Sequence, residues 1–513
     1  MKKQSLIKGS LILGIAGILT RFLGLFFRWP LIMLIGDEGV GYYQMSYPLY
    51  MFFVAMASGI PVAMSKMISE SNAIGDIEGS FQVVKESTIL MAVVGTGTSF
   101  ILFFFSQSII KFLQWDPRSY YSLIGISFAP FIISIMTVYR GFFQGFQNMT
   151  PSAISQILEQ IGRVVVGVGL AILFLNKGIE YSAGGAAFGA AAGGVIGCCY
   201  LSSRYHKIKK SYGIKKIKTN PDILNKLLVI AIPVSLGATV STIMSLIDSA
   251  LVPQKLLQAG FSNKQATVLY AQLTGKASVI VNIPLTLSVA LCTSLIPIIA
   301  ENFVLKKEKE VESKIDLALK LSALIGMPCL FGLFFMAGPI MKFIFPGRSE
   351  GIEILKYLSL SVPFVIITQT STSILQGIGS YIIPVINLFI GCIVKVILTI
   401  ILVPMRDFNI YGAVAASIGA YVVATILNVI AMKIKLKVRL NLYKNFIKPA
   451  CAASVMMLVV LIIYNVIYSL TLSNSVSCLL SIGIGAIIYA IGIILLKVFS
   501  IQDIKDKLNR NNI

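Results

Sequence analysis

The sequence predicts an all-α integral membrane protein, and three observations support this fold class. Of the 513 residues, 56% are hydrophobic and only 12% are charged, whereas a soluble domain carries about 25% charged residues. Long apolar segments follow one another, each long enough for a bilayer-spanning helix of about 20 residues. Basic residues gather in every second connection between these segments. Because so little polar surface remains to cover a water-soluble globule, we expect a chain that crosses the membrane many times.

Fourteen apolar segments are expected to form transmembrane helices. The first follows the basic segment Met1–Lys8 and continues to Ile35, which is too long for the apolar region of a cleavable signal peptide. The segments have similar lengths, which favours helices over the roughly ten-residue strands of a membrane barrel. They fall at residues 9–35, 42–68, 82–110, 120–144, 151–175, 182–203, 221–252, 270–300, 315–341, 354–378, 382–404, 411–433, 446–470 and 476–499.

Basic residues in the connections predict how these helices are oriented. With a cytoplasmic N-terminus, the connections on the cytoplasmic side carry 28 Lys and Arg residues, and those on the other side carry nine. Cytoplasmic loops of membrane proteins are enriched in Lys and Arg. We therefore expect a multi-pass protein of the plasma membrane with both termini in the cytoplasm. The same distribution accounts for the formal net charge of +22 without nucleic acid as a partner.

Three spaced patterns occur twice along the chain, in the same order. Helices one and seven share a glycine and a proline sixteen residues apart, helices two and eight share two prolines thirteen apart, and helices four and ten share a Gln-Gly pair before a proline. The residues are Gly14 and Pro30 with Gly237 and Pro253, Pro48 and Pro61 with Pro284 and Pro297, and Gln144 and Pro151 with Gln376 and Pro384. The recurrence predicts a duplicated unit of six helices.

A repeated unit with an even number of helices keeps its orientation in the membrane. We therefore expect a pseudo-twofold axis along the membrane normal, with any path across the membrane between the two copies. The longest basic connection separates the copies. The expected organisation is an N-terminal lobe of six helices, a basic cytoplasmic linker, a C-terminal lobe of six helices, and two final helices with a cytoplasmic tail. These parts cover residues 1–205, 206–220, 221–440 and 441–513.

Charged residues inside the predicted helices are the candidate functional residues. An ionised side chain at the bilayer centre costs at least about 2.5–3.5 kcal/mol, so such residues usually face a cavity or a partner. Six of the eight are basic and two are acidic, which leaves positive charge that needs water or a bound anion. The eight are Arg21, Arg28, Arg140, Glu159, Arg163, Asp248, Lys276 and Lys395.

The first predicted helix carries a stripe of glycines and arginines. Gly14, Gly17, Arg21, Gly24 and Arg28 recur at spacings of three and four, which places them on one helix face. Guanidinium groups suit bidentate binding of phosphate oxygens, so the two arginines are candidates for lining a cationic cavity. The alternative is a tight helix contact in which the second arginine extends to the membrane surface.

The other charges leave more than one interpretation open. Glu159 and Arg163 are four residues apart, an order that favours an ion pair on one helix face, and the pair is either structural or part of a substrate site. Arg140 is expected either to contact a head group or to anchor the helix end. Asp248 is a candidate for binding a coupling cation or for pairing with a base. Lys276 faces either the cavity or the outer surface.

Sequence patterns of enzymes and cofactor sites are missing. The chain has one His, His206, scattered Cys residues without a C-x-x-C motif, and no G-x-x-x-x-G-K-[ST] phosphate loop. A metal site, a cofactor and ATP hydrolysis by that motif are therefore not expected. An enzyme that acts on lipid-linked sugars would need acids or histidines clustered at one membrane face, which this sequence does not show.

A long motif in the first half of the chain indicates a resemblance to a known family. It reads Tyr139-Arg-Gly-Phe-Phe-Gln-Gly-Phe-Gln-Asn-Met-Thr-Pro151 and is followed by Ser155-Gln-Ile-Leu-Glu-Gln160. Further segments agree: Leu6–Leu13, Thr20–Gly24 with Arg28, Gly36–Tyr42 and Gly59–Lys66. With these residues the chain resembles the stage V sporulation protein B family, in the polysaccharide flippase branch of the multidrug/oligosaccharidyl-lipid/polysaccharide exporter superfamily. The resemblance covers the whole length and is densest over residues 1–205.

The resemblance implies a two-lobed transporter that flips an undecaprenyl-pyrophosphate-linked glycan from the inner to the outer leaflet. The substrate would be a peptidoglycan precursor, lipid II, used for the spore cortex, and wall-synthesis enzymes would be possible partners. Related lipid II flippases hold the pyrophosphate with arginines of helix one, a role that Arg21 and Arg28 match by helix and stripe. Two alternatives remain: a cation-coupled drug antiporter of the same superfamily, which would need an acid-rich cavity, and a non-transporting scaffold for wall synthesis.

Overall fold

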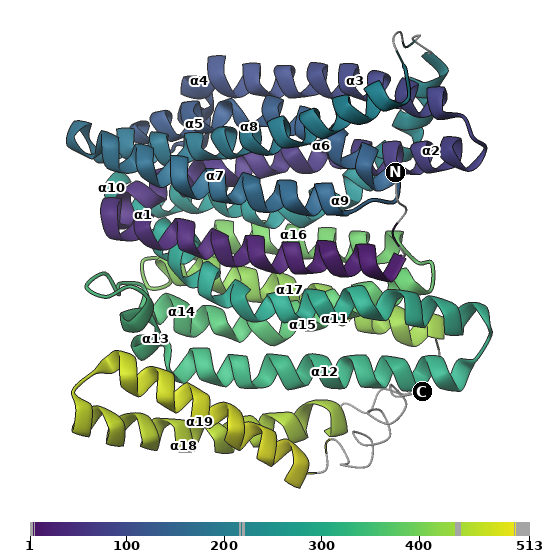
Figure 1. Ribbon diagram of the computed structural model, residues 1–513. Coiled ribbons are helices and arrows are strands. Elements are labelled where there is room, and N and C mark those ends of the chain that lie inside the picture. The colour runs from purple at the N-terminus through teal and green to yellow at the C-terminus, as the bar shows by residue number, and fades with distance from the viewer. Residues whose placement is uncertain are drawn as a thin grey trace. The chain divides into compact units, whose positions relative to one another are not determined.

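The computed structural model describes residues 4, 6–214, 217, 221–436, 443–496 and 498. Over these residues the chain is helical, with short connections and no β-strand, which confirms the all-α fold class. The chain divides into two compact units, Met1–Ala271 and Gln272–Ile513. Each unit is described by itself below (Figure 1).

The first unit consists of ten α-helices and two short 3₁₀ turns. The turns are η1 (Pro117–Ser119) and η2 (Leu175–Lys177). The helices are α1 (Leu6–Ala57), α2 (Gly59–Ala73), α3 (Ile77–Phe104), α4 (Ser106–Leu113), α5 (Tyr120–Ser127), α6 (Ala129–Gly145), α7 (Thr150–Phe174), α8 (Ile179–Ser211), α9 (Pro221–Gln258) and α10 (Asn263–Ala271).

The second unit begins in a π-helical segment, η3 (Gln272–Ala277), that continues directly from α10. A second π-helical segment, η5 (Tyr443–Ile447), and a 3₁₀ turn, η4 (Ser359–Ser361), lie further along the chain. The α-helices are α11 (Ser278–Val304), α12 (Glu308–Phe335), α13 (Ala337–Ile344), α14 (Ile352–Leu358), α15 (Val362–Gly377), α16 (Ile382–Leu402), α17 (Asn409–Leu436), α18 (Lys448–Thr471) and α19 (Asn474–Leu495).

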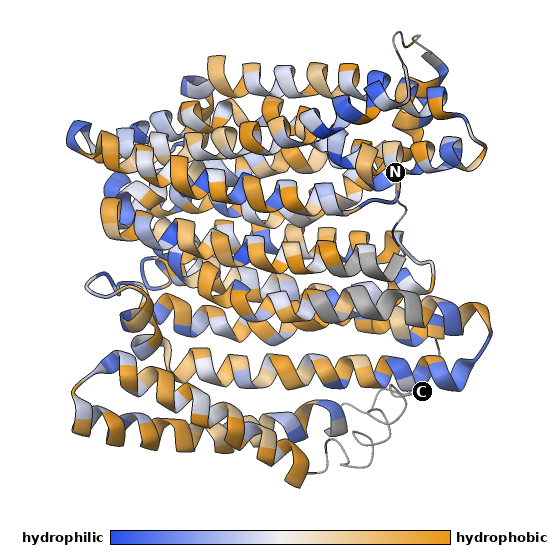
Figure 2. Cartoon of the chain, viewed as in Figure 1, coloured by the Kyte–Doolittle hydropathy of each residue, from blue (hydrophilic) through white to orange (hydrophobic). Residues whose placement is uncertain are grey.

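Twelve segments of the described chain are long and apolar enough to cross a membrane. Figure 2 shows hydrophobic residues along α12, α18 and α19, and hydrophilic residues gathered where α12 begins at Glu308. The first of the twelve, Ile12–Ala73, has 62 residues and overlaps two of the predicted spans, 9–35 and 42–68. The predicted span at 270–300 falls on η3 and α11, several of whose side chains lie outside the described residues. A multi-pass membrane protein is thus confirmed, and the count of fourteen helices stays a prediction.

The long first helix is interrupted at Gly36. This residue has φ 64° and ψ −173°, a backbone conformation that is essentially restricted to glycine. A straight helix as long as α1 and α2 together would far exceed the hydrocarbon thickness of about 30 Å. The bend at Gly36, visible within α1 in Figure 1, gives α1 one arm before the break and one after it.

The first compact unit extends beyond the basic segment that the sequence predicts as a linker. Helix α9 packs against α1 and α2, and α10 packs against α1, so both helices belong to this unit. Residues 215, 216 and 218–220 of the predicted linker, and the tail after 498, lie outside the described residues. The two predicted lobes of six helices are defined by a sequence repeat, whereas the compact units are defined by packing contacts. The lobes therefore stay a prediction.

Glycines let α7 and α8 approach each other closely. A Cβ at Gly193 of α8 would collide with the carbonyl oxygen of Glu159, and one at Gly189 would lie 2.7 Å from Cα of Gly167. Small residues at such crossings bring helix backbones together in membranes. The α7–α8 contact therefore sets the position of the α7 face that carries Glu159.

Candidate functional site

Three charged side chains of α6 and α7 form one intramembrane cluster. Nη2 of Arg140 lies 2.9 Å from Oε2 of Glu159, and Nη2 of Arg163 lies 3.4 Å from Oε1 of the same carboxylate. The three side chains are between 10% and 15% exposed. Nε of Arg140 donates to Oγ of Ser155 at 2.9 Å. Two bases thus share one acid, and the trio keeps one excess positive charge.

The helical repeat of α7 explains how this cluster forms. Ser155, Glu159 and Arg163 follow at intervals of four residues, so they line one face of α7. Arg140 reaches that face from α6, and its carbonyl oxygen accepts a hydrogen bond from Oγ of Ser152 at 3.3 Å. The expected contact between Glu159 and Arg163 is therefore present, and Arg140 joins it.

A stripe of tyrosines from the second arm of α1 lies beside the cluster. The ring centroids of Tyr43 and Tyr47 are 5.5 Å apart, and those of Tyr47 and Tyr50 are 5.9 Å apart. The charge of Arg163 acts on both Tyr43 and Tyr50. These tyrosines are absent from the predicted site because they carry no charge. Their spacing of four and three, the same helical spacing as in the arginine stripe, was the available signal.

The first arm of α1 brings Arg28 to the same region. The charge of this half-buried arginine also acts on Tyr43, and Phe27 packs edge-on against the Tyr43 ring at 5.7 Å. Arg28 and Arg163 thus both lie near Tyr43, and the three bases and one acid of this region, Arg28, Arg140, Arg163 and Glu159, are called here the arginine cluster.

Arg21 lies on the same arm but is placed differently. Its side chain is exposed, and within the described part of the chain it makes no ion pair. Gly24, between the two arginines, faces α7: a Cβ there would lie 3.6 Å from Nε2 of Gln160. Gly14 and Gly17 have open space around them. The predicted stripe therefore contacts α7 at Gly24 and is open nearer to the N-terminus.

Asp248 and Lys276 belong to other parts of the structure. Asp248 is half-buried in α9, next to Ser249, whose hydroxyl donates to the carbonyl of Met45 at 2.7 Å. Lys276 lies in η3 of the second unit, and its side chain is 1% exposed. Roles of Asp248 in coupling and of Lys276 in substrate binding stay predictions.

The ammonium of Lys276 already has protein partners. Its Nζ donates to the carbonyls of Arg348 at 2.7 Å and Glu350 at 3.4 Å, and to Oε2 of Glu350 at 3.2 Å. Burial raises the pKa of the Glu350 carboxyl, but a backbone hydrogen bond and the hydrogen bond from Lys276 outweigh it, so the pKa is lowered. This arrangement favours a structural role for Lys276, which holds the 348–350 segment against η3.

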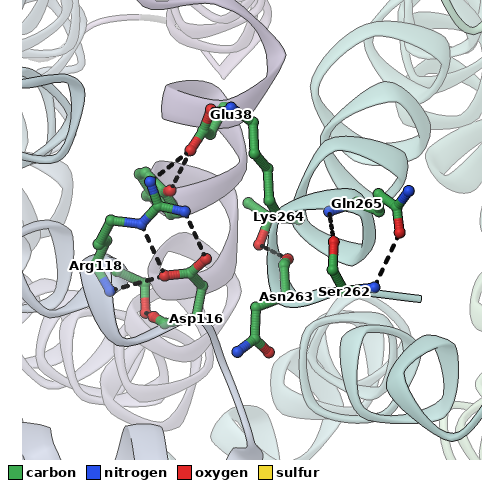
Figure 3. Close-up of polar contacts among 10 residues, drawn as sticks. Glu38, Asp116, Arg118, Ser262, Asn263, Lys264 and Gln265 are labelled. Carbon is green, nitrogen blue, oxygen red and sulfur yellow. Dashed lines mark hydrogen bonds and ion pairs between the residues drawn. The ribbon is translucent and has the colours of Figure 1, made fainter. Parts of the chain in front are cut away.

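A second polar network lies where the second arm of α1 begins (Figure 3). The carboxylate of Glu38 accepts from Nη1 of Arg118 at 2.8 Å and from Nζ of Lys264 at 2.9 Å. The hydroxyl of Tyr42 donates to Oε1 of Glu38 at 2.8 Å, and Arg118 also binds both oxygens of Asp116 at 3.2 Å. These five residues, called here the Glu38 network, join α1, the segment before α5, and α10. The charged members of this network lie in predicted connections between helices, where charged residues are ordinary, so the sequence alone does not mark them as a cluster.

Two family profiles match this chain. That of the polysaccharide biosynthesis proteins matches residues 6–303, more than half of the chain, and that of the MatE family matches residues 274–401. Together with the helical membrane fold and the intramembrane arginine cluster, these matches define a multi-pass membrane transporter of the multidrug/oligosaccharidyl-lipid/polysaccharide exporter superfamily.

Individual relatives agree with the family match. Stage V sporulation protein B of Bacillus subtilis (strain 168) is 31% identical over 432 residues, covering 82% of each chain. Lipid II flippase MurJ of the same organism is 27% identical over 445 residues, covering 82% of this chain and 81% of the relative. A solved structure of a lipid II flippase MurJ in an inward closed conformation matches with a TM-score of 0.73 and 19% identity, over 94% of this chain and 98% of that one. The chain belongs to the polysaccharide biosynthesis protein family, within which it is similar to stage V sporulation protein B.

Proposed function

We propose that this protein is a flippase that moves a lipid-linked, pyrophosphate-bearing glycan from the inner to the outer leaflet by alternating access. The observation that carries the proposal is the arginine cluster, in which three bases and one acid lie together inside the membrane-spanning part of the first unit. Uncompensated charge is costly in this environment. Arg140 and Arg163 share one carboxylate and keep one excess positive charge, which a phosphate group offsets, so the cluster suits a pyrophosphate group.

The geometry indicates how the substrate is held. Guanidinium groups bind phosphate oxygens through paired, charge-assisted hydrogen bonds. Arg140 and Arg163 share the Glu159 carboxylate in the structure described here. An entering pyrophosphate competes with that carboxylate for the same donors, while Arg28 approaches from α1. Glu159 thus keeps the two arginines paired when no substrate is bound.

The finer identity of the substrate rests on the relatives. One relative is named as a lipid II flippase and another as a stage V sporulation protein. We therefore propose lipid II, or a close undecaprenyl-pyrophosphate-linked precursor, as the substrate, with the spore cortex as the destination of the glycan. Wall-synthesis enzymes that consume the glycan are the proposed partners. No catalytic role is proposed.

Flipping of fluorescent lipid II in proteoliposomes tests the proposal. We expect wild-type protein to protect the label from an external quencher, and Arg28→Gln to lower the rate at least tenfold because a phosphate ligand is lost. Arg204→Gln, which removes an exposed arginine of α8, is the matched control and should flip at the wild-type rate. A folded Arg28→Gln protein that flips as fast as the wild type would overturn the arginine site.

The match of residues 274–401 to the MatE family favours one second candidate, a cation-coupled drug antiporter. Such a protein needs carboxylates for its cationic substrate, whereas bases exceed acids in the arginine cluster. Ethidium efflux from the same proteoliposomes under a sodium or proton gradient distinguishes the two functions. Efflux of ethidium without movement of lipid II would favour the antiporter function over the flippase function. Movement of neither compound would favour a non-transporting scaffold for wall synthesis.

A further inference from the structure

A hollow of about 710 Å³ lies at one end of the first unit, and no residue of the arginine cluster lines it. Ligand sites in proteins measure roughly 300–1,000 Å³, so it is large enough for one or two sugar rings. It lies at the end formed by α4, the segment before α5, and the start of α10. The charge bias of the connections predicts that this end faces the outside of the cell. We call this cavity the outer hollow. Its polar and aromatic lining comprises Gln107, Gln114, Trp115, Tyr120, Tyr121 and Asn263.

The chemistry of this lining is neutral and rich in hydrogen-bonding groups. Three primary amides each offer two donors and an acceptor oxygen, and two phenols each donate and accept. Among the described residues that line it, no carboxylate is present, and Lys111 is the one base. A cation therefore finds no counter-charge here, and a phosphate finds a single ammonium. A purely apolar ligand would leave the amides without partners.

Aromatic rings supply a flat apolar surface beside these amides. The ring centroids of Tyr120 and Tyr121 are 5.5 Å apart and nearly perpendicular. Tyr121 also packs on Tyr181 at 4.2 Å and donates its hydroxyl to that of Tyr181 at 3.0 Å. Amides next to aromatic faces match a sugar ring, which carries hydroxyl groups around its edge and C–H groups on its faces.

Buried contacts hold both walls of the outer hollow in place. The indole N–H of Trp115 donates to the carbonyl of Ser249 at 2.7 Å, and the buried Asp116 beside it binds Arg118. Figure 3 shows how the Glu38 network connects this wall to the start of α10, where Lys264 follows Asn263. The site is therefore preorganised rather than a gap between mobile loops.

We propose that the outer hollow binds the carbohydrate head group of the lipid-linked glycan after it has crossed the membrane. This inference rests on the proposed function, since it assigns the hollow to the glycan that the arginine cluster releases. The tyrosine rings stack on a sugar face, and the amides bind its hydroxyl and N-acetyl groups. The ammonium group of Lys111 pairs with one acidic substituent on the glycan.

Tryptophan fluorescence gives a direct test, because the chain has two Trp residues and Trp115 lines the hollow. In a Trp29→Phe background, the emission reports on Trp115 alone. We expect a saturable change when N,N′-diacetylchitobiose is titrated onto the protein in nanodiscs, which expose both membrane faces. Tyr121→Ala should weaken the apparent affinity at least tenfold. Phe112→Ala, which removes an 83% exposed aromatic outside the lining, should leave it unchanged.

Two further arms keep the outcomes distinct. Tyr121→Phe keeps the ring and loses only the hydroxyl, so it should fold and retain most of the affinity. It tests the stacking role of the ring even if Tyr121→Ala fails to fold, and a Tyr121→Phe protein that lost the affinity would contradict that role. Fluorescent lipid II flipping is measured for the same proteins. Saturable sugar binding without flipping would leave the carbohydrate site standing and remove the proposed function. Flipping by a protein whose Trp115 emission never responds to the disaccharide would overturn the outer hollow as a sugar site.

Discussion

At the scale of single residues, the cluster around Glu159 shows how a sequence pattern becomes a site. The spacing of Glu159 and Arg163 predicts their contact, which the structure contains at 3.4 Å. That Arg140 shares the same carboxylate depends on how α6 packs against α7, and no spacing within one helix reveals it. The tyrosines at 43, 47 and 50 were missed for a related reason, since aromatic stripes at helical spacing usually mark packing alone.

Replacing the shared acid with glutamine should destabilise the protein more than replacing one of the two bases with glutamine. Glu159→Gln leaves Arg140 and Arg163 without their carboxylate, and removing one member of a buried ion pair costs about 3–5 kcal/mol. Arg140→Gln leaves the pair between Glu159 and Arg163 intact, so its melting temperature should fall less. Thermal unfolding of both variants in detergent measures the difference.

The same pair of variants also tests whether the arginine cluster binds an anion. Inorganic pyrophosphate should raise the melting temperature of Glu159→Gln more than that of Arg140→Gln, because the former has two free guanidinium groups and the latter has one base fewer. Equal losses of stability, or equal responses to pyrophosphate, would show that Glu159 does not neutralise the cluster.

The contact of Lys276 with Glu350 predicts a pH dependence. The pKa of Glu350 is lowered from its ordinary value of 4.5 by a backbone hydrogen bond and by Lys276, against the opposing effect of burial. A carboxyl with a lowered pKa in the folded state adds stability above its unfolded-state pKa and loses it as the pH falls through the folded-state pKa. Wild type should therefore melt higher than Glu350→Gln at pH 7, and the difference should shrink as the pH falls below 4.5 and vanish below the folded-state pKa.

The size of this difference should be small, because the Glu350 side chain is 61% exposed and solvent screens the interaction. Asp407→Asn, at an exposed acid of the same unit, controls for the general effect of removing a negative charge. A gap between wild type and Glu350→Gln that widened toward acid pH would contradict the assigned direction.

At the scale of elements, glycines decide where helices meet and turn. Apolar segment lengths predict most of the helices, because bilayer thickness fixes their length. They do not predict that the first two spans join into one helix interrupted at Gly36, since that bend depends on a single backbone conformation. Nor do they predict that α10 packs with the first unit and η3 with the second, because this follows from side-chain contacts far apart in the sequence.

Gly193 provides a prediction at this scale. Its Cα faces the carbonyl of Glu159 so closely that an added methyl group must push α8 away from α7. Gly193→Ala should therefore lower stability by about 1–3 kcal/mol, the usual cost of overpacking, and should slow flipping because Glu159 moves with α7. Gly169→Ala in α7 meets open space and is the matched control. Equal melting temperatures for the two variants would show that α7 and α8 tolerate a wider spacing.

At the scale of the whole molecule, the membrane potential should drive the proposed reaction. The arginines of the cluster are fixed on α1, α6 and α7, so their charges return to the start in every cycle. The charge carried across the membrane is then that of the substrate. For two negative charges moving outward from a negative interior, 100 mV contributes about 4–5 kcal/mol. No nucleotide hydrolysis is needed.

Lipid II flipping under an imposed potassium diffusion potential checks this prediction. A potential that is negative on the side of the basic loops should raise the fraction of lipid II in the opposite leaflet, and reversing the potential should lower it. In this arm sodium and strongly buffered pH are equal on both sides, so that ion coupling does not contribute, and separate arms impose a proton or a sodium gradient without a potential. If the distribution ignored the potential and followed one of those gradients instead, the substrate would cross with its charge compensated by a coupled ion. Asp248, which the sequence marks as a candidate for binding a coupling cation, would then be the residue to replace, and Asp248→Asn should abolish that coupling.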